Sequence, residues 1–259
     1  MATEAERTYA CRLDPERALR SLDEAAEFLH DRGMLTITPC CSLPSLHAAC
    51  HEEPYLPGGR GFAAYPRTKY VWGFQLAARP GVHVLKLHRG KSLLVTDDVA
   101  RLAGPLARAE LARADSGEHG ADARRLVQHL NDAGPSELGD LKTELGLSPK
   151  RLRAARDRLE RVGAVVSRAV VIEPHAHTSV LERWDQRFPV DAGGLDDLLV
   201  ALVRAAVLAP ERELATWLSW RLPPGTVDRL VTEHRLQRTE AGVSAGPAES
   251  DPSRRHPAR

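Results

Sequence analysis

A short basic segment, residues 148–168, has the residue types that could bind a polyanion. It reads SPKRLRAARDRLERVGAVVSR and contains seven basic and two acidic residues. The whole chain of 259 residues has a formal net charge of only +1, so the positive charge is concentrated locally. Arginine combines charge with a forked set of donors that fits phosphate groups and guanine edges. The pattern favours a nucleic-acid contact that is confined to one patch.

The same segment predicts a helix with one buried face. Ser148 suits an N-cap and Pro149 the first helical position. The apolar residues Leu152, Ala155, Leu159 and Val162 recur at helical spacing and form one stripe. Off this stripe, or on the strand-like run that follows, we expect these DNA-binding residues: Lys150, Arg151, Arg153, Arg158 and Arg168. The alternative is that the arginines pair with acids at helical spacing, or that the unit binds another protein.

Helices must position this segment, and the surrounding sequence predicts them. Residues 122–134 and 135–146 are expected to form two helices, the second with Ser136 as N-cap, and strand-like runs follow residue 164. Helix, helix, helix, strand, wing and strand is the order of a winged helix-turn-helix unit. A second set of three helices is predicted further along the chain, over 195–209, 210–220 and 223–235, followed by a strand from the run LQRTEAGVS.

The first part of the chain predicts a mixed α/β module. A helix is expected over 23–33, a strand over 34–38, a hairpin over 82–96 that turns at HRGK, and a helix over 97–114. The expected fold class is therefore mainly α with small antiparallel β-wings (α+β), built from tandem winged helix-turn-helix modules. The expected units are an N-terminal winged-helix-like module (1–114), a central winged helix (121–190), a C-terminal winged helix (191–242) and a disordered tail (243–259).

Two further basic stretches could support a DNA contact. In PRTKYVWGF, Arg67 and Lys69 alternate with aromatic residues, a mixture that can stack a base or follow a strand. In the HRGK turn, Arg89 and Lys91 could contact phosphates. The alternatives are that the aromatic side chains belong to the core and that HRGK is a plain turn.

The cysteines suggest neither a metal nor a disulfide framework. The run CHEEPY (50–55) lies near Cys40 and Cys41, but its spacing matches no zinc finger, and adjacent cysteines are poorly placed to ligate one ion together. We therefore predict no metal and no cofactor. The start of the chain is polar, and the longest apolar run, 195–209, is too short to cross a bilayer. These features predict a cytoplasmic, nucleoid-associated protein with reduced thiols and no membrane contact.

Three stretches resemble AlkZ-related proteins, a group close to the AlkZ-type (YcaQ-type) DNA glycosylases. They read FLHDRGMLTITPCCSLPSLHAACHEEPY, TKYVWGFQLAARPGVHVLKLHRGKSLLV and LERVGAVVSRAVVI, and they include the patterns K-x-x-W-G and H-R-G-K. The resemblance covers most of residues 20–240. It implies winged helices, binding of double-stranded DNA and, in the glycosylases, hydrolysis of the N-glycosidic bond of alkylated purines.

The resemblance also identifies where this chain departs from the enzymes. Their Gln-x-Asp or Gln-x-Gln motif, which positions and activates a water, corresponds to Thr36 and Thr38 here. A threonine hydroxyl cannot act as a general base at neutral pH or stabilise a developing cation by charge. Glu52 and Glu53 are the carboxylates that could substitute for the missing acid.

The expected function is binding of double-stranded DNA or DNA lesions by a monomer, without the family's standard catalytic motif. One alternative is an active DNA glycosylase that uses a substitute carboxylate. Another is a winged-helix transcriptional regulator, which normally requires a dimer with paired half-sites.

Overall fold

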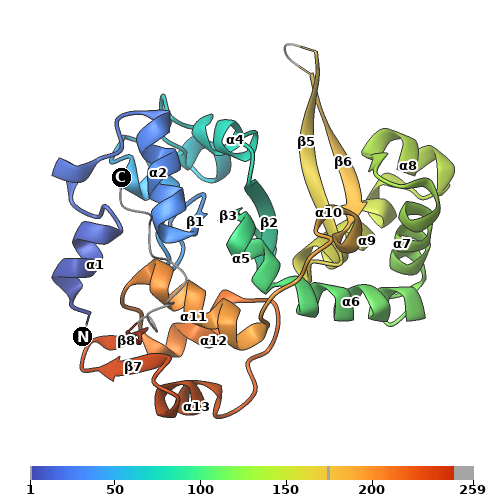
Figure 1. The fold of residues 1–259 in the computed structure, drawn as a ribbon. Coiled ribbons are helices and arrows are strands. Elements are labelled where there is room, and N and C mark those ends of the chain that lie inside the picture. Colours follow the sequence, from blue (N-terminus) through green and yellow to red (C-terminus); the bar gives the residue numbers. More distant parts are fainter. Residues whose placement is uncertain (1, 174–175, 248–259) are drawn as a thin grey trace, which may run out of the picture.

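A computed structural model describes residues 2–173 and 176–247 (Figure 1). Within these ranges the chain is largely helical, with two three-stranded sheets and one two-stranded sheet, all antiparallel. The expected α+β class is confirmed at this level. No helix in the described part is long and apolar enough to cross a membrane.

The first part of the chain surrounds a small sheet. Its helices are α1 (Glu4–Ala10), α2 (Leu22–Arg32), α3 (Leu46–Ala49), α4 (Trp72–Ala77) and α5 (Asp97–Leu102), with 3₁₀ turns at Pro15–Arg17 and Gly61–Ala64. Its strands are β1 (Met34–Thr36), β2 (Val82–His88) and β3 (Lys91–Thr96), in the order β1-β3-β2. Ser21 caps α2, and Gly33 ends that helix at a φ of 75°, a left-handed conformation that glycine adopts without strain. The helix therefore leads directly into β1.

The central part has the same order of elements around its own sheet. It begins with α6 (Gly104–Ser116) and continues with α7 (Ala121–Ala133), β4 (Ser136–Glu137), α8 (Leu138–Glu144) and α9 (Pro149–Arg161). β5 (Val165–Glu173) and β6 (Ala176–Arg183) form a long hairpin, followed by α10 (Trp184–Arg187). The strand order is β4-β6-β5. Figure 1 shows this part on one side of the molecule, which the chain enters at α6 and leaves after α10.

The C-terminal part packs against the N-terminal part. It contains α11 (Leu195–Ala206), α12 (Glu211–Trp217), α13 (Thr226–Thr232), β7 (Leu236–Thr239) and β8 (Gly242–Ala245). Ala209 pairs with Val243 of β8 in an isolated antiparallel bridge, which puts a third extended segment beside this hairpin. One apolar cluster joins α11 and α12 to β1, β2 and α5, and includes Trp184 and Trp217. The central part has a separate cluster between α7, α8 and α9.

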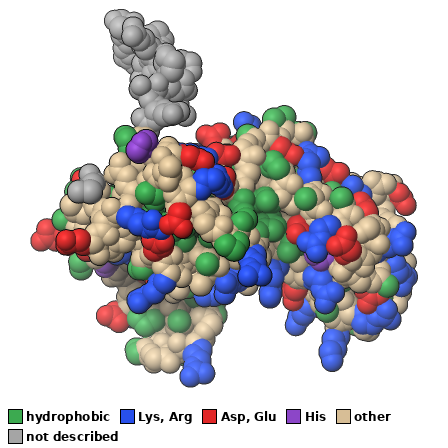
Figure 2. Space-filling view, turned by 90° about the horizontal axis from the view of Figure 1, so that it is seen from below, with side chains coloured by type: hydrophobic (Ala, Val, Ile, Leu, Met, Phe, Trp, Pro, Cys, Tyr) green, Lys and Arg blue, Asp and Glu red, His purple; other side chains and the backbone are tan. Residues whose placement is uncertain are grey.

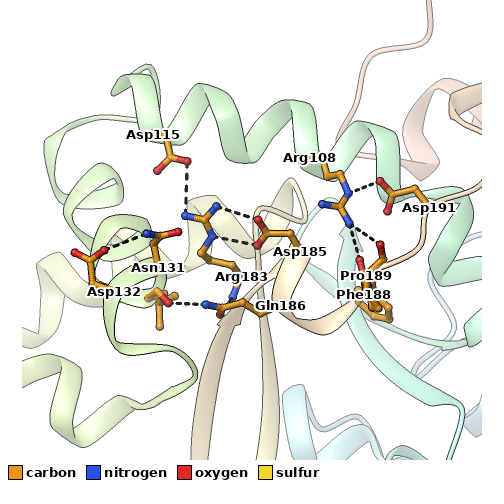
Figure 3. A network of polar contacts seen from close by, with 11 residues as sticks. Arg108, Asp115, Asn131, Asp132, Arg183, Asp185, Gln186, Phe188, Pro189 and Asp191 are labelled. Carbon is orange, nitrogen blue, oxygen red and sulfur yellow. Dashed lines mark hydrogen bonds and ion pairs between the residues drawn. The ribbon is translucent and has the colours of Figure 1, made fainter.

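A polar network fastens the end of the central hairpin to α6 (Figure 3). The Arg183 guanidinium donates two hydrogen bonds to Asp185, at 3.0 and 3.1 Å, and lies 3.7 Å from Asp115. The Arg108 guanidinium pairs with Asp191 and donates to the Phe188 carbonyl. Because Arg108 and Asp115 both belong to α6, the network fixes the path by which the chain leaves the central part.

Three local expectations differ from the structure. Ser136 does not cap a helix. It lies in β4, where it pairs with Leu181 of β6, and its hydroxyl donates to the Gly134 carbonyl. The single helix expected over 97–114 is two helices, and a Cβ at Gly104 would lie 2.2 Å from Asp191, so the close approach of that segment requires glycine. β8 includes residues 243–245, which the sequence had assigned to the tail.

Candidate nucleic-acid interface and adjoining pocket

The basic helix α9 forms as the sequence predicts. The Ser148 hydroxyl accepts a hydrogen bond from the Arg151 backbone N–H, and Pro149 is the first helical residue. Leu152, Ala155 and Leu159 are buried. Their stripe packs the helix on α7, while another side of α9 contacts β2 of the N-terminal part. The helix therefore lies between two parts of the molecule, and only a portion of its surface remains exposed.

Two of the predicted basic residues on α9 are exposed and unneutralised. Lys150 and Arg153 form no ion pair with any described residue. Arg151 differs, because Asp122 accepts two hydrogen bonds from its guanidinium, at 2.6 and 2.8 Å. Arg158 donates to the His119 carbonyl at 2.7 Å. The predicted set is therefore split, with two cations available and two held by the protein.

Arg161 extends the exposed basic face to the turn between β2 and β3. Lys150, Arg153, Asp157 and Arg161 recur at three- and four-residue spacing and share one side of α9. The Arg161 guanidinium lies beside Gly90 in the turn between β2 and β3, since a Cβ built on that glycine would be 3.3 Å from the Arg161 Nε atom. Lys91 is exposed in the same turn, and Arg89 donates to the Ala215 carbonyl at 3.1 Å. We call Lys150, Arg153, Arg161 and Lys91 the cationic row.

The remaining predicted DNA contacts lie elsewhere. Arg168 on β5 is half-exposed and 3.6 Å from the buried carboxylate of Glu182. Arg67 is exposed after the 3₁₀ turn, and the Lys69 ammonium lies 5.4 Å from the Trp72 ring centroid. The two residues between the hairpin strands, 174 and 175, lie outside the described residues. Figure 2 shows basic and acidic side chains interspersed on one face of the molecule, with Lys and Arg gathered along its lower edge.

A pocket of about 350 Å³ adjoins the end of the cationic row. Its walls include two threonines, a cysteine, two tyrosines and a lysine of the row: Thr36, Thr38, Cys40, Tyr65, Tyr70 and Lys91. Thr36 is only 2% exposed, and its hydroxyl donates to the Pro44 carbonyl at 3.2 Å. Its side chain is thus committed to the backbone, and aliphatic residues such as Ile37 and Val84 also line the pocket.

Neither candidate carboxylate lines this pocket. Glu52 accepts a hydrogen bond from the Thr68 backbone N–H at 2.7 Å and lines a different cavity, beside His47. Glu53 is exposed, and its backbone carbonyl accepts from Arg67 at 3.1 Å. The structure therefore does not bring Glu52 or Glu53 to the position that a substitute catalytic acid would need.

Glu160 is a site residue that sequence reasoning missed. It is 3% exposed, pairs with Lys86 of β2 and lies 3.2 Å from the Arg156 Nε atom, and it accepts from the Ser167 hydroxyl. These contacts hold α9 against β2 at one wall of a second cavity, of about 280 Å³, between β2 and β5. In the sequence, Glu160 stands among arginines and suggests only an ion pair within its own helix. Nothing near it in the sequence identifies Lys86 of β2 as a partner.

Cys40 and Cys41 both approach His88, another residue that the sequence did not single out. Hydrogen bonds from Cys41 and His88 lower the pKa of Cys40 to about 4, and the hydrogen bond to Cys40 together with burial raises that of Cys41. Cys50 lies elsewhere, with its thiol directed to the Leu46 carbonyl, and His51 contacts the Arg12 carbonyl. The run 50–55 therefore does not assemble a metal site with Cys40.

Comparison with known proteins gives no match: no family model, no curated protein and no solved structure resembles the chain closely enough to be reported. The resemblance to AlkZ-related proteins stays a sequence-based expectation.

Proposed function

We propose that this protein binds double-stranded DNA along the cationic row of α9 and the β2–β3 turn. The observation that carries the proposal is that Lys150 and Arg153 are exposed without a carboxylate partner in the described chain, in line with Arg161 and Lys91. Lys150 and Arg161 are eleven residues apart, so the row extends for about 16 Å along the helix. In a protein of near-zero net charge, such a row is where a polyanion would be held.

The order of the elements supports this proposal. In the N-terminal part and in the central part, a helix, a strand, two helices and two strands follow one another, and the last strand lies between the other two. In the C-terminal part, the bridge between Ala209 and Val243 completes the same arrangement. This order supports the proposal that each part is a winged helix, a fold whose third helix commonly enters the major groove. We infer three such units in tandem, with α9 as the third helix of the central one.

The pocket supports binding in preference to hydrolysis. Thr36 is buried and bonded to the backbone, and Glu52 and Glu53 lie outside the pocket. Tyr65 and Tyr70 in its walls offer aromatic surface to a base that has left the helical stack. Alkylated duplex DNA is therefore expected to be retained by the protein without release of the base.

Duplex binding tests the proposal directly. Fluorescence anisotropy with a short labelled duplex, repeated over a range of salt concentrations, gives both the affinity and the number of phosphate contacts. The pair Lys150→Ala and Arg153→Ala is expected to weaken binding on the order of 10-fold and to reduce the salt slope by about 2.

A matched pair removes the same charge elsewhere. Arg229 and Arg238 of the C-terminal part are already paired, with Asp196 and with Glu211 respectively. Arg229→Ala combined with Arg238→Ala is expected to leave binding unchanged. Equal losses of DNA affinity in the two double variants would mean that only net charge matters. Unchanged binding by the variant with Lys150→Ala and Arg153→Ala would exclude the cationic row as the DNA site.

A further inference from the structure

Two sulfur atoms and one imidazole nitrogen converge at the edge of the pocket. The Cys40 Sγ atom lies 3.4 Å from the His88 Nε2 atom, the Cys41 Sγ atom lies 4.0 Å from it, and the two sulfur atoms are 4.0 Å apart. The cysteines follow β1 and the histidine ends β2, so strand pairing through β3 brings them together. Although the cysteines are adjacent in sequence, both sulfurs face the same ring nitrogen.

The surroundings fix which nitrogen of His88 is free to act as a ligand. The His88 Nδ1 atom lies 2.6 Å from the Trp217 carbonyl oxygen. A carbonyl can only accept, so Nδ1 carries a proton. Nε2, which faces the two sulfurs, is therefore the nitrogen that can give up its proton and bind a metal ion. Metal-binding histidines are commonly oriented in this way, by a hydrogen bond from the second nitrogen to a carbonyl or carboxylate. His88 is 5% exposed, so its ring is held firmly.

The distances match those around a single small ion. With a metal–sulfur bond of about 2.3 Å and a metal–nitrogen bond of about 2.0 Å, tetrahedral angles separate two sulfurs by about 3.8 Å and sulfur from nitrogen by about 3.5 Å. The observed separations are 4.0 Å between the sulfurs and 3.4 and 4.0 Å from sulfur to nitrogen. They differ from the ideal values by about 0.5 Å or less, which small side-chain rotations can remove. Cys40 is exposed, which leaves a fourth position open to water.

We propose that Cys40, Cys41 and His88 bind one thiophilic d¹⁰ metal ion, Zn²⁺ or Cu⁺. Thiolate and imidazole ligands select these ions over Mg²⁺ or Ca²⁺, which prefer oxygen. The ion would connect the loop after β1 to the end of β2, and through the Trp217 carbonyl it would stabilise the contact with α12. Metal binding can be tested without DNA, because the ligands do not include Lys150 or Arg153 of the cationic row.

Metal titration of the reduced full-length protein tests this inference. Zn²⁺ and Cu⁺ are each titrated in competition with a chromophoric chelator, and Co²⁺ serves as a spectroscopic probe that absorbs through sulfur-to-metal charge transfer. One equivalent is expected to bind, and Cys40→Ser is expected to weaken binding on the order of 100-fold. Since Cys40 is exposed, this variant should keep its fold, which circular dichroism checks.

Cys50→Ser is the matched control, because Cys50 belongs to the same part of the molecule but its thiol donates to the Leu46 carbonyl, away from Cys40 and His88. It is expected to bind the ion as the unmodified protein does. A saturating ion should also raise the melting temperature of the unmodified protein and of Cys50→Ser, but not that of Cys40→Ser. Uptake of neither ion, equal uptake by Cys40→Ser, or a Cys40–Cys41 disulfide in freshly isolated protein would each overturn the inference.

Discussion

Glu160 decides which arginines of α9 remain available to a ligand. Its buried carboxylate engages Arg156 from its own helix and Lys86 from β2, so neither cation is free. The amphipathic pattern of residues 148–162 predicts the helix and its outward charges correctly. It cannot predict that β2, far away in the sequence, covers one side of the helix, because the partner Lys86 contributes nothing to the local periodicity. The count of basic residues therefore overestimates the exposed charge.

His47 leads to a prediction of pH-dependent stability at the scale of one residue. Burial lowers its pKa to about 4, and neither ring nitrogen has a hydrogen-bond partner in the described chain. The pKa in the unfolded chain is about 6.5, so the unfolded state binds the proton more readily. The stability that depends on neutral His47 is present above pH 6.5 and is lost as the pH falls towards 4, at a cost of about 3 kcal/mol.

His47→Phe should remove this loss while keeping the aromatic contact with Tyr65, whose ring centroid lies 4.7 Å from that of His47. Urea unfolding at pH 7 and at pH 4 measures the effect. The loss of unfolding free energy between these pH values is expected to be about 3 kcal/mol smaller in the variant. His30→Phe, at an exposed position of α2, is the control. Identical pH profiles for the unmodified protein and His47→Phe would contradict the prediction.

At the scale of elements, the two serines expected to cap helices have different outcomes. Ser148 precedes a proline and a regular apolar stripe, and the structure places it at the N-cap of α9. Ser136 has similar local chemistry, but its backbone pairs with Leu181 of β6. A two-residue strand is too short to produce an alternating pattern, so only the distant partner strand reveals it. The helix that begins after Ser148 was therefore predictable, whereas the shortest strand was not.

The two serines predict different effects of the same substitution. Ser148→Ala removes the side-chain acceptor for the Arg151 N–H and is expected to destabilise the protein by about 1 kcal/mol. Ser136→Ala removes only a hydroxyl that bonds the Gly134 carbonyl two residues away, so a loss of less than about 0.5 kcal/mol is expected. Urea unfolding at constant pH compares them, and a reversed order would show that the cap is not formed in solution.

At the scale of the whole molecule, the first and last parts of the chain share a core. Leu199, Leu202 and Val203 of α11 belong to the same buried cluster as Met34 of β1 and Leu93 of β3. The sequence predicted three units in a row, because periodicity identifies helices and turns one at a time. It contains no signal for which units pack together. The site depends on this packing, since the Trp217 carbonyl of the C-terminal part orients His88 of the N-terminal part.

A truncated protein tests the shared core. A fragment of residues 1–190 lacks α11 and α12 and would expose the apolar surface of β1, β3 and α5 that these helices cover. Burial of such surface contributes about 25 cal/mol per Å², so the N-terminal part is expected to lose cooperative unfolding and to bind a hydrophobic dye such as ANS. A fragment of residues 1–247 retains every element named above and is the control. If the 1–190 fragment melted at the temperature of the 1–247 fragment, α11 could not be part of the core that positions His88.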